Sequence, residues 1–285
     1  MIFLGTGTSE GVPRVSCLTK DPPTCRVCLS TQLSKDRSPN RRRNTSVLVR
    51  RPGPDGRVRN VVIDVGKFFW HSALEWFVKY RVPTLDAVVL THAHADSAGG
   101  LDDLRDWTNN VQAAVPIYLR EQDLDVISRT FYYLVDRDKS TSGGGISMLD
   151  FHVIDEQPFD VEGLCFIPLE VQHGRNLTAL GFRIGDFVYI SDASHIPDAT
   201  AGLMQGAEVM VMDALRPRRT HGSHFTLEEA LDQIRRFRPA RALLTDMTHD
   251  YDHDETNAEL ARLKRTEGID VQLAHDGLRV PVTLC

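Results

Sequence analysis

The residues with the clearest chemistry are two histidines and an aspartate in residues 91–96, THAHAD. His92 and His94 are two positions apart, so on an extended chain both imidazoles leave from the same face, and Asp96 follows where the chain bends. The apolar residues 85–90 directly before them predict a buried strand that ends in this loop. Two imidazoles and a carboxylate at a strand end are typical of a divalent metal site. For this segment alone, a surface loop with two solvated histidines is the alternative.

Three further positions repeat the pattern of a histidine or aspartate placed just after an apolar, strand-like run. They are His173, Asp192 and His249. One such case carries little weight, because loops collect polar residues. A series of strand ends that supplies only His and Asp is what a metal site assembled at a sheet edge requires.

These residues resemble the metallo-beta-lactamase superfamily of metal-dependent hydrolases, whose HxHxDH signature the chain matches through Asp96. Within it, the chain is similar to the cyclic phosphodiesterase branch, which includes the phosphoribosyl cyclic phosphate diesterase of phosphonate breakdown. The resemblance extends from Ile2 to about His253. It depends on residues 5–13 (GTGTSEGVP), the cysteine-rich segment after them, residues 43–46 (RNTS), Ser191 and Asp192.

The resemblance implies an active site for two metal ions. His92, His94 and His173 would hold the first ion, Asp192 would bridge, and Asp96 with His249 would hold the second. The family signature usually ends in a second-metal histidine, and here that position is Ser97. A serine hydroxyl is a poor zinc ligand, so we expect the second ion to be weaker, replaced by Mn²⁺, completed by water, or absent. Zinc is the expected catalytic ion and manganese is the alternative.

Three cysteines within residues 11–44 predict a second, structural zinc site. Cys25 and Cys28 form a CxxC pair that can chelate a tetrahedral zinc, and Cys17 lies near enough to add a third thiolate. Taken alone, the pair is also consistent with redox chemistry or with two unrelated core thiols. The resemblance implies a histidine as fourth ligand, and His253 fits. Such an ion would join the long N-terminal loop to the C-terminal part of the active site.

Composition is consistent with a single enzyme domain over residues 1–285, with 41% hydrophobic and 25% charged residues. A formal net charge of −6 gives no general attraction to nucleic acid or to an anionic membrane, so we expect neither as a partner. The start of the chain is not of the secretory type, and no apolar window is long enough to span a bilayer, which predicts a soluble, cytoplasmic protein. The oligomeric state is left open, with a homodimer as one alternative. The odd count of five cysteines favours thiols or metal ligands, and Cys165 is expected to be a buried apolar residue.

Strand-like and helical runs alternate along the chain. Apolar residues at three- and four-residue spacing predict one helix from Phe69 to Tyr80, and residues 227–237 predict a second amphipathic helix. The αββα sandwich of the resembled family, two sheets packed face to face with helices outside, accommodates this order. The polar and glycine-rich residues 132–148 predict a loop that is either a lid or an insertion.

The predicted activity is metal-assisted hydrolysis of a cyclic or small organic phosphate diester, in which a metal-bound hydroxide attacks phosphorus. Besides Asp96, the candidate catalytic residue is His224 in residues 221–226 (HGSHFT). The resemblance suggests that a histidine there handles the leaving alkoxide or grips the phosphate, which makes it the candidate general acid. Its alternative interpretation is a polar residue at a helix start.

Other functions stay open at this point. A tRNA 3′ processing nuclease shares the architecture, but it would need an extended arm, and no insertion here is long and basic enough to supply one. Thioester or lactone hydrolysis uses the same metal centre. A non-catalytic metalloprotein is favoured only by Ser97.

Overall fold

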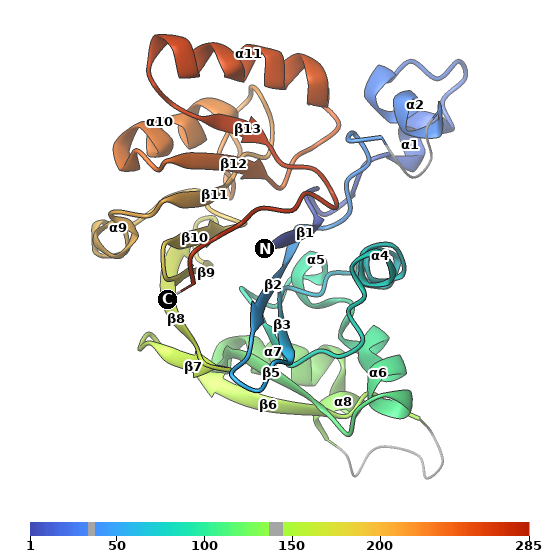
Figure 1. Ribbon diagram of the computed structural model, residues 1–285. Coiled ribbons are helices and arrows are strands. Elements are labelled where there is room, and N and C mark those ends of the chain that lie inside the picture. Colours follow the sequence, from blue (N-terminus) through green and yellow to red (C-terminus); the bar gives the residue numbers. More distant parts are fainter. Residues whose placement is uncertain (34–37, 137–144, 285) are drawn as a thin grey trace.

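The computed structural model describes residues 1–33, 38–136 and 145–284, which form two β-sheets with helices on their outer faces (Figure 1). The first sheet has six strands in the order β1 (Ile2–Gly5), β2 (Ser46–Pro52), β3 (Val58–Ile63), β4 (Ala87–Val89), β5 (Val115–Arg120) and β6 (Leu149–Ile154). The second has seven, in the order β13 (Val271–Leu273), β12 (Arg241–Thr245), β11 (Val209–Asp213), β10 (Phe187–Ile190), β9 (Thr178–Ile184), β8 (Leu164–Gln172) and β7 (Phe159–Val161).

The helices fall into three groups along the chain. The cysteine-rich segment forms α1 (Val15–Leu18) and α2 (Arg26–Leu33). The helices of the second group lie between strands β3 and β6 along the chain. They are α3 (Phe69–Ser72), η1 (Ala73–Phe77), α4 (Val78–Tyr80), α5 (Ala95–Ala98), η2 (Leu101–Leu104), α6 (Arg105–Asn110), α7 (Glu121–Thr130) and α8 (Tyr132–Val135). The second sheet carries α9 (Asp198–Met204), α10 (Leu227–Phe237) and α11 (His253–Thr266).

In the central strands, residues alternate between two hydrophobic cores, which shows that both faces of each sheet are covered there. In β2, Val47 and Val49 pack between the sheets, whereas Leu48 packs under the helices of the first sheet. In β10, Tyr189 packs between the sheets and Ile190 packs under α9, α10 and α11. This period of two is what a strand with two covered faces requires. The predicted αββα sandwich is confirmed.

Most strands that end near the predicted ligands run parallel to a neighbour, whereas β8, which ends before His173, pairs antiparallel with β9. In the first sheet β3 pairs with β4, and β4 with β5, in parallel register. In the second sheet β10, β11, β12 and β13 are parallel as well. Parallel neighbours end at the same edge, so the loops after β4, β10, β11 and β12 gather where the two sheets meet. That edge carries the candidate site.

Two local expectations compare directly with the structure. The predicted helix from Phe69 to Tyr80 forms as α3, η1 and α4 in succession, with a π-helical middle turn, and α10 covers the predicted residues 227–237. The expectation for Cys165 is wrong, because this side chain is exposed: the pleat of β8 turns its neighbours Leu164 and Phe166 inward and Cys165 outward.

Two further predictions concern the loop at residues 132–148 and membrane-spanning helices. Residues 132–148 begin with the short helix α8, and residues 137–144 lie outside the described residues, so the lid and the insertion remain equal alternatives. None of the helices in the described ranges combines the length and the apolar character needed to cross a lipid bilayer.

Candidate metal centre and active site

Three histidines from both sheets bring ring nitrogens to one point. Nε2 of His92 lies 2.9 Å from Nδ1 of His94, and Nε2 of His173 lies 3.3 Å from the same nitrogen. Two nitrogen ligands of a tetrahedral zinc ion lie about 3.3 Å apart, given Zn–N bonds of about 2.0–2.1 Å. The donor set and its spacing therefore fit one divalent cation.

Hydrogen bonds on the outer side of the rings fix which nitrogen faces this point. Nδ1 of His173 lies 2.9 Å from the carbonyl oxygen of Ser223, which can only accept, so Nδ1 carries the proton. Nδ1 of His92 lies 2.9 Å from Oγ1 of Thr91, and that hydroxyl donates to the carboxylate of Asp64. The hydroxyl therefore accepts from His92. In both rings the lone pair of Nε2 is left for a metal ion.

The loop that carries these ligands depends on one close backbone approach. An added Cβ at Gly66 would lie 1.9 Å from the carbonyl oxygen of Asp96. Only glycine allows the segment after β3 to pack directly against the first turn of α5. The amide of Val65 also donates to the carbonyl of Ser97, which holds this turn beside the sheet.

The electrostatics favour neutral imidazoles next to one anion. Burial lowers the pKa of His92 to about 3, and it lowers the pKa of His173 as well. Burial acts to raise the pKa of Asp192, but His92, His224 and His173 outweigh it and lower that pKa to about 2. Neutral imidazoles and a carboxylate are the protonation states in which these side chains bind a cation.

Asp192, just after β10 in the second sheet, lies next to His173, whereas Asp96 belongs to no group of potential ligands in the described chain. Ligand atoms of His173, Asp192 and His224 all lie within 4.8 Å of one another. In the described chain, Asp96 belongs to no such group of three or more His, Cys, Asp or Glu side chains. Its carboxyl instead takes a hydrogen bond from the side chain of Ser9, and burial and the charge of Asp192 raise its pKa.

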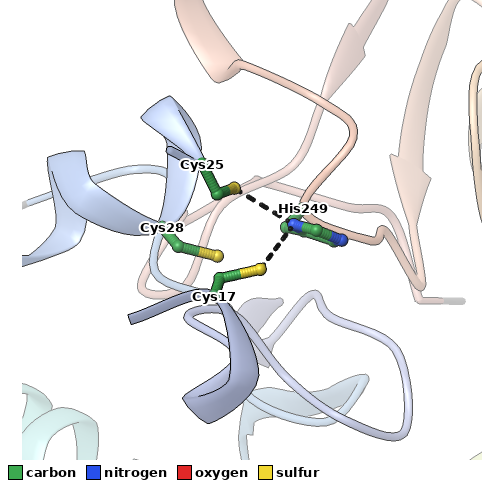
Figure 2. A group of neighbouring side chains, drawn as sticks. All are labelled: Cys17, Cys25, Cys28 and His249. Carbon is green, nitrogen blue, oxygen red and sulfur yellow. Dashed lines mark hydrogen bonds between the residues drawn. The ribbon is translucent and has the colours of Figure 1, made fainter. Parts of the chain in front are cut away.

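Figure 2 shows three cysteines around His249, which differs from both predictions for the C-terminal histidines. Nδ1 of His249 lies 3.1 Å from Sγ of Cys25 and 3.5 Å from Sγ of Cys17, and Cys28 completes the group. His249 therefore does not face the active-site histidines, and the prediction that it holds a second catalytic ion is corrected. The loop after β12 passes beside α1 and α2, which brings this ring to the thiols.

His253 was predicted as the fourth ligand of the cysteines, and the structure corrects this as well. His253 is the first residue of α11, and its buried ring turns along that helix. Its Nε2 lies 3.0 Å from Nδ2 of Asn257, and its ring packs against His275. The start of α11, capped by Asp252, directs this side chain away from the thiols.

The cysteine group has the donor chemistry of a structural zinc site. Burial is the largest influence on the Cys28 thiol and raises its pKa to about 12, so a cation is needed to hold this group as thiolates. Three thiolates and one imidazole are a common structural zinc set. Nη1 of Arg14 lies 2.8 Å from Nε2 of His249, and this contact must loosen once Nδ1 binds an ion, because Nε2 then carries the ring proton.

His224 lies beside the three-histidine centre and is held by two buried carboxyl groups. Its Nδ1 lies 3.0 Å from Oδ2 of Asp213 and 3.1 Å from Oδ2 of Asp246, and its ring centroid lies 4.8 Å from that of His173. Burial acts to lower the pKa of His224, but the two carboxyls outweigh it and raise the pKa to about 12. The ring is therefore an imidazolium at neutral pH. The sequence prediction did not include either carboxyl, although Asp213 ends β11 and Asp246 follows β12, which is the same strand-end pattern.

Comparison with known proteins agrees with this architecture. The profile of the beta-lactamase superfamily domain matches residues 59–247. An octanoyltransferase of Porphyromonas gingivalis (strain ATCC BAA-308 / W83) is 32% identical over 248 residues, which are 87% of this chain and 46% of that protein. The chain thus spans about half the length of this curated relative.

Solved structures give the same result over nearly the full length. A crystal structure described as a new diphosphatase from the PhnP family is 32% identical, with a TM-score of 0.80 and coverage of 99% of this chain and 97% of the other. Zinc-bound PqqB from Methylobacterium extorquens is 17% identical with a TM-score of 0.71 and 99% coverage of both chains, a likeness of fold alone. The chain therefore belongs to the metallo-beta-lactamase superfamily of metal-dependent hydrolases.

Proposed function

We propose that the protein is a phosphodiesterase that hydrolyses cyclic or small organic phosphate diesters. The observation that carries this proposal is the convergence of His92, His94, His173 and Asp192 beside the imidazolium of His224. The likeness to a PhnP-family diphosphatase supports a phosphorus-containing substrate.

Four side chains are proposed to hold the active-site cation: His92 and His173 through Nε2, His94 through Nδ1, and Asp192 through its carboxylate. When bound, a divalent cation there lowers the pKa of a coordinated water and neutralises charge on the phosphoryl oxygens. Three imidazoles with one carboxylate suit zinc, and Mn²⁺ is the alternative ion. In the cysteine group, the three thiolates and His249 are proposed to hold a structural zinc.

His224 is proposed to act as the general acid. Asp213 accepts from Nδ1, so Nε2 is the nitrogen left for substrate. Its positive charge attracts the phosphate at neutral pH, and its Nε2–H is the donor that can protonate the leaving alkoxide. Asp213 and Asp246 keep the ring in place while the proton leaves from the opposite nitrogen.

Hydrolysis of an acyl thioester is the second candidate, because the curated relative is called an octanoyltransferase. That relative is about twice as long as this chain, so its name does not by itself assign an acyl activity to the part that matches. The same metal centre can attack a polarised carbonyl, and the fold does not choose between the two substrates.

A direct assay separates these candidates. Purified protein with its metals counted is given a bis-aryl phosphate, a cyclic nucleotide and an octanoyl thioester, with and without added Mn²⁺. We expect turnover of a phosphate diester that is lost in His94→Ala and kept in the control His71→Ala, whose side chain lies exposed on α3. Thioester turnover without phosphodiester turnover would favour the second candidate. A metal-replete protein inert towards all three substrates would contradict the proposal.

A further inference from the structure

The resembled family implies a second catalytic ion, and the side chains expected to bind it do not come together. Ser97 stands where the signature has a histidine. His249 faces Cys17 and Cys25 instead, and Asp96 is hydrogen-bonded by Ser9 outside any cluster of potential ligands in the described chain. Of the predicted second-ion ligands, Asp192 alone belongs to a group of potential ligands that includes an active-site histidine in the described chain. One carboxylate is too few to hold a second ion.

The space beside Asp192 is occupied by another side chain. Ligand atoms of Asp192, His173 and His224 lie within 4.8 Å of one another, so the imidazole of His224 stands next to the first ion's ligands. Its side chain is only 12% exposed, and the loop before α10 fixes its position. A second ion bridged by Asp192 would have to lie close to this ring, whose positive charge would repel it.

His224, Asp213 and Asp246 are themselves close enough to be considered as a metal site, but their hydrogen bonds argue against it. Oδ2 of Asp213 accepts from the amides of Ala193 at 2.9 Å and Phe225 at 3.4 Å, and from Nδ1 of His224 at 3.0 Å. Oδ2 of Asp213 has little capacity left for a cation because it already accepts three donors, and Nδ1 of His224 has no lone pair to offer because it donates. Oδ1 of Asp213 and Oδ2 of Asp246 make no hydrogen bond, but two carboxyl oxygens without a further donor are too few to hold an ion. The group is therefore a hydrogen-bonded clamp around an imidazole.

We infer that the active centre takes one divalent cation, and that His224, clamped by Asp213 and Asp246, fills the place beside Asp192 where a second ion would lie. This inference rests on the proposed metal-dependent hydrolysis and specifies its active site. A phosphate in this centre meets a cation on the side of the three histidines and an N–H donor on the side of His224. The phosphate is thus bound by one metal ion and one N–H donor, instead of by two metal ions.

Counting metal ions per chain tests the inference without an assay of activity. Elemental analysis of protein loaded with excess zinc and then freed of unbound ions is expected to give two per chain, one at the cysteines and one at the histidines. His94→Ala and Cys25→Ala should each lose one. Asp213→Asn should keep both, as should its exposed control Asp106→Asn. Three ions in the wild type, or one ion fewer in Asp213→Asn, would overturn the inference.

Electron paramagnetic resonance of the Mn²⁺-loaded wild type gives a readout that does not depend on the folding of any variant. We expect the spectrum of isolated ions, because the cysteine and histidine sites do not share a ligand. Spin coupling between two Mn²⁺ ions would show a dinuclear centre and overturn the inference while leaving the proposed function intact. If His94→Ala instead keeps the full zinc content, the proposed metal site itself fails.

Discussion

At the level of single residues, the hydroxyl of Thr91 connects the ring of His92, a proposed metal ligand, to a buried carboxylate. It accepts from Nδ1 of His92 and donates to Asp64, which is fully buried, and the Thr91 amide donates to the same carboxylate. Partners of this kind orient a ligand and set its basicity, and their loss typically weakens metal binding by about 10–100-fold. Thr91 is thus a positioning residue for His92.

Thr91→Val tests this role, because valine has nearly the same shape but no hydroxyl. We expect zinc affinity at the histidine site to fall by about 10–100-fold, measured by competition with a chelator. The control is Thr130→Val at the exposed end of α7, where the hydroxyl only donates to the carbonyl of Val126. An affinity equal to wild type in Thr91→Val would show that the connection does not position His92.

Strand ends can be recognised from apolar runs, which made His92, His94, His173 and Asp192 candidate ligands, and the resemblance assigned the three histidines to one ion. In the structure the three histidines form one group, and Asp192 belongs to a second group that shares His173. The strand-end rule could not decide between His249, in the loop after β12, and His253, four positions later at the start of α11. That choice depends on where α1 and α2 place the thiols and on where α11 begins, and both are set by tertiary packing.

At the level of secondary-structure elements, one buried ion pair connects the two halves of the proposed metal site. Oδ1 of Asp123, in the first turn of α7, accepts from the amide of Ala93 between the two ligating histidines. Nε of Arg120 donates to the same carboxylate, and its Nη2 donates to the carbonyl of Thr178 at the start of β9. The backbone carbonyl of the neighbouring Leu177 accepts a hydrogen bond from the amide of His173. The pair therefore ties the loop after β4 to the turn between β8 and β9.

Arg120→Met removes this connection and leaves Asp123 buried without its partner. Breaking a buried pair in this way typically costs about 3–5 kcal/mol, and we expect urea unfolding of the metal-free variant to show a loss of that order. The zinc affinity of the histidine site should fall as well, because its two halves are no longer held in register.

Arg105→Met is the matched control for Arg120→Met. Arg105 also pairs with an aspartate three positions away, Asp102, but both side chains are more than one third exposed. Exposed pairs contribute at most about 1 kcal/mol, so this variant should stay close to wild type in stability and in zinc affinity. Equal losses in the two variants would contradict a special role for Arg120.

The order of the elements was easier to predict than their detailed form. Alternating strand-like and helical runs indicated layered sheets and helices, and the family resemblance singled out the αββα sandwich, which accommodates that order. The π-helical turn of η1 could not be predicted, because the apolar spacing from Phe69 to Tyr80 is equally consistent with a regular α-helix.

At the level of the whole molecule, stability in acid depends in part on His253. Burial is the main cause that lowers the pKa of His253, to about 4, with His275 and Arg42 acting in the same direction. The ring is neutral in the folded protein and titrates near 6.5 once unfolded. Its contribution to stability is therefore complete above pH 6.5 and is lost as the pH falls towards 4. This loss amounts to about 3 kcal/mol.

His253→Gln replaces this ring by a side chain that does not titrate. We expect urea unfolding of the metal-free protein to show a smaller loss of stability between pH 7 and pH 4.5 in this variant than in the wild type. His71→Gln, at an exposed position, should keep the wild-type dependence. If His253→Gln and the wild type lose stability in parallel, His253 is not buried in its neutral form.

The cysteine group joins the N-terminal segment to the C-terminal half of the molecule. In Figure 1, α1 and α2 stand to one side of the two sheets, and Figure 2 shows that His249 reaches this segment from the loop after β12. The fully buried guanidinium of Arg42 also binds this loop, because it donates hydrogen bonds to the carbonyls of Thr248 and Tyr251. This loop also continues from Asp246, so the zinc ion proposed at the cysteines would fix one end of the segment that clamps His224.

Cys25→Ser should therefore weaken the active site from a distance. We expect loss of one zinc per chain, faster proteolysis around α1 and α2, and reduced turnover, while the ion at the histidines is retained. Cys165→Ser is the control, since this exposed thiol on β8 lies outside the group. Turnover should fall because Asp246 no longer holds His224 firmly, so KM should change less than kcat. An unchanged zinc content in Cys25→Ser, or equal proteolysis in both variants, would contradict a structural ion that joins the two parts.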